Sequence, residues 1–102
     1  MATKSAKRLA PIHPGEVLQD LLQEAGLTVN ALALALRVPA NRIGSIIKGQ
    51  RGITADTALR LARYFGTSAQ MWMNLQAKYD LEAAEDAIGR KVEREVLPRS
   101  AA

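Results

Sequence analysis

Four side chains near the middle of the chain have the chemistry to contact a polyanion: Asn41, Ser45, Lys48 and Arg51. Short polar side chains such as the first two can hydrogen-bond to the edge of a base, whereas cations such as the last two can neutralise a phosphate. Neither kind of contact makes or breaks a covalent bond. This stretch therefore predicts a binding surface and not a catalytic centre.

Positive charge is concentrated around the same stretch. Between Thr28 and Arg63 six cations are opposed only by Asp56, so this segment carries a net charge of +5, whereas the segments before and after it carry 0 and −1. The full chain of 102 residues carries +4. A basic patch inside a folded segment indicates a polyanionic partner. The six cations are Arg37, Arg42, Lys48, Arg51, Arg60 and Arg63.

Other site chemistries find little support in the sequence. The chain has no cysteine and one histidine, His13, so it can build neither a disulfide nor a metal cage, and we expect no metal and no cofactor. We interpret His13 as a helix cap or a surface residue. The run of carboxylates at Asp80, Glu82, Glu85 and Asp86 is interpreted as a solvated helix face, so we expect no catalytic residue and no enzyme.

Targeting signals are also missing from the sequence. The first 16 residues contain cations but no apolar run that could form the core of a signal peptide. Nowhere do about 18 uncharged apolar residues follow one another, as a membrane-spanning helix would need. We therefore expect a cytoplasmic protein without a membrane partner.

The spacing of apolar residues predicts helices throughout and no strand. Pro14 begins the first helix, and Gly26 follows its end. Thr28 caps a short second helix that Pro39 prevents from continuing. Pro39 in turn begins a third helix, which Gly49 closes.

Two further helices are expected in the second half of the chain. Thr54 caps the fourth, which ends at Gly66, and Ser68 caps the fifth. A weaker apolar stripe continues over residues 81–96, where Gly89 could break it. With 48% hydrophobic residues the chain has enough apolar material for one core, so we expect a single folded domain. Its expected limits are residues 10–80, between a flexible N-terminus at 1–9 and a C-terminal helix and tail at 81–102.

The third predicted helix has one apolar face and one polar face. At about 100° per residue, Ile43, Ile46 and Ile47 share one side of the helix. Two short helices joined by a tight turn, the second flanked by cations, are typical of a helix-turn-helix. The side opposite the isoleucines carries Asn41, Ser45 and Lys48, with Arg42 and Gly44 at its edges.

Three blocks of sequence carry a family resemblance. They are HPGE at residues 13–16, ITADTALRLARYFGTS at residues 53–68 with Gly52 ahead of it, and WMNLQ at residues 72–76. On these blocks the chain resembles the HigA antitoxins, the VapI-like branch of the Xre, or lambda-repressor-like, helix-turn-helix family. The likeness runs from His13 to about Ala84, which is most of the chain.

The resemblance implies both a fold and a function. The fold would be all-α, a lambda-repressor-like helix-turn-helix bundle of about five helices plus a C-terminal helical extension. The function would be that of a homodimer that binds double-stranded operator DNA, represses its own operon and neutralises a HigB-like toxin that cleaves translated mRNA. A stand-alone Xre-type transcriptional regulator without a toxin is the alternative. A regulator paired with a metallopeptidase is a third class, and the chain itself contains no H-E-x-x-H.

The resemblance also assigns the DNA-binding residues. The family's second helix falls on residues 28–36 and its recognition helix on residues 39–48. The wider pattern favours glycine in the turn between these helices, where this chain has Arg37. Either the turn differs slightly or Arg37 is kept to contact a phosphate. The implied DNA-binding set is Thr28, Asn30, Arg37, Ala40, Asn41, Arg42, Gly44, Ser45, Lys48 and Arg51.

Two partner surfaces are predicted from the remaining residues. The helices after Gly66 contain more apolar side chains than one small core uses, so we expect two copies to meet there, through Trp72, Leu75, Tyr79, Leu81, Ile88 and Val92. A basic toxin would contact an acidic surface. The candidates are the run at residues 80–86 and the first helix, with Glu16, Asp20 and Glu24.

Overall fold

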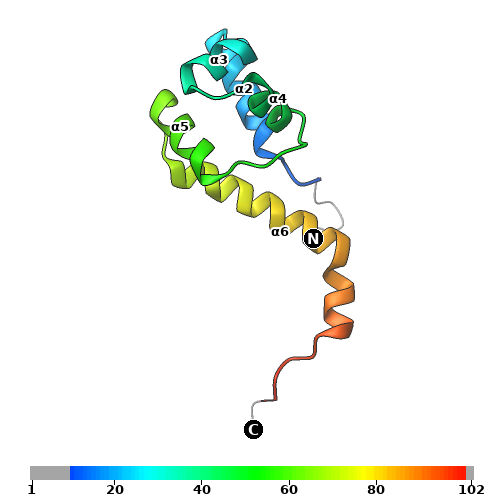
Figure 1. The fold of residues 1–102 in the computed structure, drawn as a ribbon. Helices are drawn as coiled ribbons and strands as arrows, with labels where there is room; N and C mark the ends of the chain where they lie inside the picture. The colour runs from blue at the N-terminus through cyan, green and yellow to red at the C-terminus, as the bar shows by residue number, and fades with distance from the viewer. Residues whose placement is uncertain (1–9, 101–102) are drawn as a thin grey trace.

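The computed structural model describes residues 10–100, and within that range the chain forms five α-helices and no strand. The predicted flexible N-terminus, residues 1–9, lies outside the described residues. Figure 1 shows four short helices packed together above one long helix that extends away from them. An all-α helix-turn-helix bundle is therefore confirmed. The helices are α2 (Pro14–Ala25), α3 (Val29–Leu36), α4 (Ala40–Ile47), α5 (Ala55–Phe65) and α6 (Ala69–Glu95).

The predicted polar caps are present at the helix starts. The Thr28 hydroxyl accepts a hydrogen bond from the Ala31 N–H at 3.0 Å, and the Ser68 hydroxyl accepts one from the Met71 N–H at 3.0 Å. Thr54 caps α5 in the same way. Each hydroxyl occupies one of the backbone donors that a helix start leaves without a partner. These caps fix where α3, α5 and α6 begin.

His13 is a helix cap, which confirms one of its two predicted roles. Its Nδ1 accepts a hydrogen bond from the Gly15 N–H at 2.9 Å, and its own backbone N–H donates to the Glu16 carboxylate at 3.2 Å. The ring packs edge-on against Tyr79, with 4.8 Å between ring centroids. The single histidine thus secures the start of α2 and connects it to α6.

The core lies where α2, α3, α4 and α5 meet the first half of α6. Trp72 is completely buried there, and its indole N–H donates a hydrogen bond to the Thr67 hydroxyl at 2.9 Å. Helices α2 and α4 approach so closely that a Cβ on Gly15 would stand 2.0 Å from the Ile46 carbonyl oxygen. Only glycine fits at that crossing. The buried apolar side chains are Leu18, Leu22, Leu32, Ala33, Leu36, Ile43, Ile46, Ile53, Ala58, Leu61 and Trp72.

Helix α6 differs from the prediction in two respects. It runs without a break through Gly89 to Glu95, because one glycine weakens a helix without having to end it, although the ribbon bends where yellow turns to orange (Figure 1). The expected contribution of Trp72 to a dimer contact is wrong, because that side chain is buried in the protomer's own core. Leu75 is likewise packed against the core.

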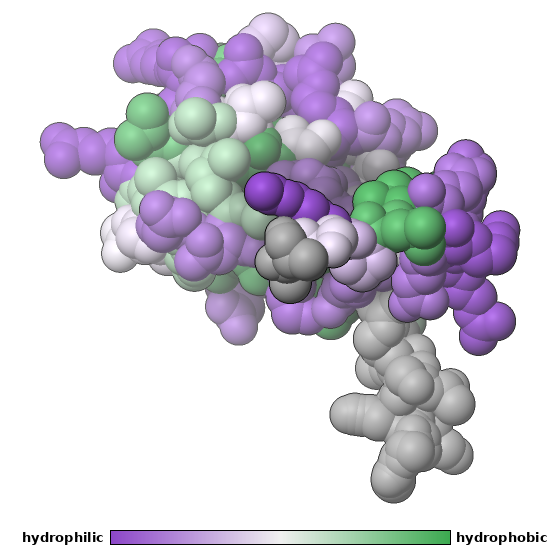
Figure 2. Space-filling model, turned by 90° about the horizontal axis from the view of Figure 1, so that it is seen from below, coloured by the Kyte–Doolittle hydropathy of each residue, from purple (hydrophilic) through white to green (hydrophobic). Residues whose placement is uncertain are grey.

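Apolar side chains nevertheless remain on the surface of α6 and the segment after it. Figure 2, which views the molecule from below, shows green apolar areas between the purple polar ones. Leu81, Ile88 and Val92, three of the residues predicted to lie in a dimer contact, are exposed. Val96 and Leu97, beyond the end of the helix, are exposed as well. None of the helices in residues 10–100 is long and apolar enough to cross a membrane.

Candidate nucleic-acid interface

The turn between α3 and α4 is tight and left-handed at Arg37. This residue has φ 62° and ψ 43°, and it is the only residue other than glycine with a positive φ in the described part of the chain. The Val38 N–H returns to the Ala33 carbonyl at 3.0 Å, and the Arg37 N–H returns to the Leu34 carbonyl at 3.2 Å, which closes the end of α3. Of the two alternatives for Arg37, an altered turn is therefore wrong. The chain makes the glycine-type turn with an arginine in it.

A left-handed arginine costs free energy that a glycine would not. The penalty for a residue with a Cβ is roughly 1 kcal/mol or more. The Arg37 side chain is exposed and has no hydrogen bond or ion pair to any residue in 10–100. No side-chain contact with residues 10–100 therefore offsets the cost of placing an arginine here.

Helix α4 is held by its isoleucines, so its opposite face is exposed. Ile43 and Ile46 are completely buried, and the helix packs against α2 and α3. On the other side Asn41 and Lys48 are exposed, while Ser45 is partly exposed. This agrees with the face assignment that the apolar periodicity predicted. Ala40 is also exposed and Gly44 is partly exposed.

Asn41 is not needed to cap its own helix. The N-cap residue of α4 is Pro39, and the helix start has no hydrogen bond from a capping side chain. Within residues 10–100 the Asn41 side chain has no hydrogen-bond partner. Its amide can both donate and accept, so it is available to a ligand that approaches this face.

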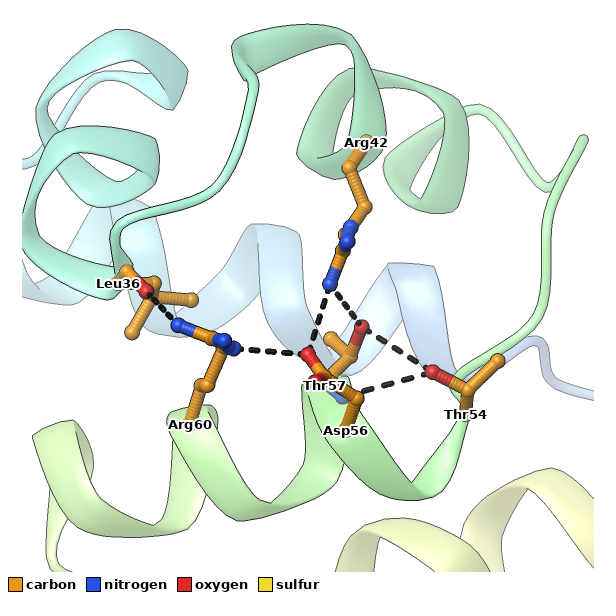
Figure 3. A network of polar contacts seen from close by, with 6 residues as sticks. All are labelled: Leu36, Arg42, Thr54, Asp56, Thr57 and Arg60. Carbon is orange, nitrogen blue, oxygen red and sulfur yellow. Dashed lines mark hydrogen bonds and ion pairs between the residues drawn. The ribbon is translucent and has the colours of Figure 1, made fainter.

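The Arg42 side chain leaves the outer face of α4 and lies on α5. Its Nη1 donates to the Asp56 carboxylate at 2.9 Å and lies 3.5 Å from the Thr57 hydroxyl (Figure 3). The family resemblance instead places Arg42 among the base-facing residues of the predicted DNA-binding set. Sequence periodicity could not find this partner, because Asp56 lies 14 residues further along the chain.

Asp56 binds a second arginine at the same time. Its Oδ1 also accepts from Arg60 Nε at 2.7 Å, and Arg60 Nη1 donates to the Leu36 carbonyl at 2.8 Å (Figure 3). Hydrogen bonds from Arg60 and then from Arg42 lower the pKa of the Asp56 carboxyl below its ordinary value. The carboxylate therefore stays charged at neutral pH and neutralises part of the positive charge of this segment.

The loop after α4 is held by a buried glutamine. The Ile53 N–H donates to Gln76 Oε1 at 2.6 Å, and Gln76 Nε2 donates to the Asp80 carboxylate at 2.9 Å. A Cβ on Gly52 would stand 3.0 Å from the Gln76 side chain, so the loop passes directly over it. This contact fixes the path of the chain next to Arg51. The sequence block that contains Gln76 gives no sign of its role, because its partner lies 23 residues earlier.

The free cations lie around the exposed face of α4. Arg37 is in the turn before the helix, Lys48 follows its last residue, and Arg51 is in the loop beyond. All three are exposed, and none makes an ion pair within residues 10–100. Arg51 also lines a cleft of about 650 Å³, together with Thr54 and Asp80. Thr28 and Asn30, the two remaining residues of the predicted set, are exposed at the start of α3.

The arrangement can bind an anion. Within the described residues no group of three or more His, Cys, Asp or Glu side chains could hold a metal ion. The surface offers amide and hydroxyl groups in its middle and free cations at its edges. That is the distribution with which a helix contacts bases and the phosphates beside them.

Comparisons with known proteins agree with this geometry. A helix-turn-helix family model matches residues 18–72, more than half of the chain. Virulence-associated protein I of Dichelobacter nodosus is 54% identical over 87 residues, which cover 83% of this chain and 81% of that protein. Antitoxin HigA-1 of Vibrio cholerae is 36% identical over 72 residues, covering 70% of this chain and 68% of that protein.

A solved structure gives the same result in three dimensions. The structure of Pseudomonas aeruginosa antitoxin HigA with the higBA promoter superposes with a TM-score of 0.85 at 52% identity, covering 88% of this chain and 99% of that one. The family consists of helix-turn-helix proteins and not of enzymes, as the sequence predicted. On the family model, the shared sequence and the shared fold, the chain belongs to the HigA antitoxin family of helix-turn-helix proteins.

Proposed function

We propose that the protein is a sequence-specific DNA-binding antitoxin that represses its own operon and neutralises a HigB-like, mRNA-cleaving toxin. The observation that carries the DNA-binding part is the outer face of α4. Asn41 has no partner within residues 10–100, and Lys48 and Arg51 stand free at the far end of the helix. The Pseudomonas aeruginosa HigA structure, solved with its promoter, supports the same role here. We expect the protein to bind DNA and the toxin in the cytoplasm.

The proposed docking follows from the placement of α4. Asn41 and Ser45 face base edges in the major groove, while Lys48 and Arg51 reach only the phosphate backbone. One α4 reads one half-site, so an operator of two half-sites requires a dimer with its recognition helices about 34 Å apart. The protein is therefore expected to act as a homodimer.

The apolar residues left exposed on α6 support the dimer. Leu81, Ile88 and Val92 are spaced by seven and four residues, so they share one face of the helix. Nothing in residues 10–100 buries that face, and a second copy would cover it. Sedimentation at micromolar concentration should show a dimer for the wild type and a monomer for Ile88→Glu.

Leu59→Glu is the matched control for the dimer. Like Ile88, which is 48% exposed, Leu59 is an exposed apolar residue, at 63%, but it lies on α5 and not on the proposed face of α6. This variant should remain dimeric. If the wild type stays monomeric even on DNA, the proposed dimer does not exist. If the Ile88→Glu variant is still a dimer, the dimer contact lies elsewhere.

The toxin contact is proposed at an acidic surface, because a ribonuclease that binds RNA is expected to be basic. On α2, Asp20 and Glu24 are exposed and make no ion pair within residues 10–100. On α6, Asp80 already accepts a hydrogen bond from Gln76. Both surfaces remain candidates for the contact.

Co-expression tests the antitoxin role directly. Expressed together with the product of the gene adjacent to its own, the protein should restore growth of cells that this product alone arrests. An Asp20→Lys, Glu24→Lys variant tests the surface on α2, and an equivalent change of Glu85 and Asp86 tests the one on α6. If cells stay arrested although both proteins are soluble, the antitoxin role fails. Operator binding in that case would identify a stand-alone regulator.

A further inference from the structure

One carboxylate connects three helices at the candidate interface. Asp56 Oδ1, in the first turn of α5, accepts hydrogen bonds from Arg42 of α4 at 2.9 Å and from Arg60 of α5 at 2.7 Å. Arg60 extends the connection to the C-terminal end of α3 through the Leu36 carbonyl at 2.8 Å. Helix α4 is therefore tied to α5 through Asp56, and α3 is tied to α5 through Arg60, which Asp56 also holds (Figure 3).

Helix α4 has few other means of fixing its N-terminal half. It contains only eight residues, and its start has no capping side chain. Its two completely buried side chains, Ile43 and Ile46, lie on one face in its centre and second half. Arg42 is the third residue of the helix, next to Asn41, and it forms an ion pair with Asp56. A shift of this end would move Asn41 out of reach of a base edge.

We infer that Asp56 is a positioning residue for sequence recognition. By holding Arg42 on α5, it fixes the direction of the first half of α4 and keeps the Arg42 guanidinium away from DNA. Discrimination between sequences then rests on Asn41 and Ser45. This role of Asp56 rests on the proposed DNA binding, and it concerns how the recognition helix is held.

Electrostatic repulsion alone predicts that removing Asp56 strengthens DNA binding without lowering specificity. An anion near the DNA surface repels phosphate, so its loss should strengthen binding to any sequence. Release of Arg42 would add a further cation for non-specific contact. The positioning role predicts that specificity falls even as attraction to phosphate rises. The two accounts therefore differ in the ratio of operator affinity to scrambled-DNA affinity.

A double-mutant cycle separates these accounts. Asp56→Asn, Arg42→Gln and the double variant are titrated with operator and scrambled duplexes at one salt concentration. The double variant has the net charge of the wild type. We expect each single change to lower the operator-to-scrambled ratio about tenfold, the equivalent of one base contact, and the double variant to lose no more than either single variant.

Other outcomes would overturn the inference. If Arg42→Gln lowers the ratio but Asp56→Asn preserves or raises it, Arg42 itself reads the DNA. If the two losses multiply in the double variant, the residues act independently. If neither change alters the ratio, the ion pair is incidental to recognition.

Matched variants test whether the loss of one negative charge, and not the loss of the Asp56 contacts, changes the ratio. Asp20→Asn removes the same charge from α2, outside the network, and should leave the ratio unchanged. Asp56→Glu keeps a carboxylate and should restore most of the ratio that Asp56→Asn loses. All titrations are made well below the unfolding midpoint of each variant, so that a loss of stability alone does not change the ratio.

Amide hydrogen exchange tests the same role without DNA. In the free protein, Asp56→Asn should accelerate exchange in α4 and at the end of α3, but not in α2. Unchanged exchange in α4 would refute the positioning role whatever the DNA titrations show. A wild type that does not distinguish operator from scrambled DNA would instead refute the proposed function, while the exchange result would still decide whether Asp56 holds α4.

Discussion

Raising the salt concentration should weaken operator binding, and the number of free cations next to α4 sets how steep the effect is. Six cations lie between residues 28 and 63, but Arg42 and Arg60 are both bound to Asp56. Arg63 lines a groove with Leu59 and Tyr64 and is not placed beside α4. Among the described residues, 10–100, the free cations next to α4 are Arg37, Lys48 and Arg51.

The magnitude follows from counting these cations. Three per protomer give roughly six phosphate contacts in a dimer, and each lowers the slope of log affinity against log salt by about 0.9, so the slope should be about −5. Between 50 and 200 mM salt the affinity should then fall about 10³-fold. If all six cations contacted phosphate, the slope would be about −11.

Fluorescence anisotropy of a labelled promoter duplex at several salt concentrations measures this slope. A value near −5 supports the count of free cations. A value near −9, which corresponds to about ten contacts, would show that DNA releases Arg42 and Arg60 from Asp56, contrary to the positioning role, and a value near −11 would add Arg63. A slope near zero would refute the electrostatic account of this surface altogether.

Three substitutions test how the helices and the turn between α3 and α4 are placed. Gly15→Ala should lower the free energy of unfolding by about 1 to 3 kcal/mol, because its Cβ would collide with the Ile46 carbonyl. Gly44→Ala should raise the free energy of unfolding by up to about 1 kcal/mol, because a Cβ at Gly44 would meet no atom within 4 Å and alanine favours the helix. Arg37→Gly should stabilise the fold by about 1 kcal/mol by relieving the left-handed turn, yet reduce the salt slope by about two per dimer. Thermal or denaturant unfolding measures the stability of the three variants, and the same anisotropy titration measures the salt slope of Arg37→Gly. A Gly15→Ala protein as stable as the wild type would contradict the first prediction. An Arg37→Gly protein with an unchanged slope would contradict the second.

Local signals predict much of the fold correctly. Helix starts at Thr28, Thr54 and Ser68 can be found because a capping hydroxyl acts within three residues. The apolar spacing of Ile43 and Ile46 identifies the inner face of α4 for the same reason, since helical periodicity is local. Both inferences depend only on neighbours along the chain.

Contacts between residues that are distant along the chain are absent from the sequence predictions. The partner of Arg42 is Asp56, and that of Ile53 is Gln76, and each pair joins two different elements, so the periodicity of one helix does not reveal it. The apolar side chain of Trp72 predicts that this residue is buried, but the sequence does not show whether it is buried in the protomer's own core or against a second copy. In the structure it is buried in the protomer's own core. The low helix propensity of Gly89 favours a break, although the flanking residues carry the helix through it.

The central claim is that α4 reads bases with its exposed face while the cations beyond it contact only the backbone. Asn41→Ala and Arg51→Ala separate these two jobs. Loss of Asn41 should cost about 1 to 3 kcal/mol of discrimination per half-site, whereas loss of Arg51 should weaken binding to every sequence alike. Both side chains are exposed, so neither change should disturb the fold, and circular dichroism checks this.

The most direct test is the ratio of operator affinity to scrambled-DNA affinity for these two variants and the wild type. The ratio should fall for Asn41→Ala and stay unchanged for Arg51→Ala, while the salt slope of Arg51→Ala decreases by about one for each phosphate that is no longer neutralised. If Asn41→Ala keeps the wild-type ratio and Arg51→Ala abolishes it, α4 does not read the bases with its Asn41 and Ser45 face.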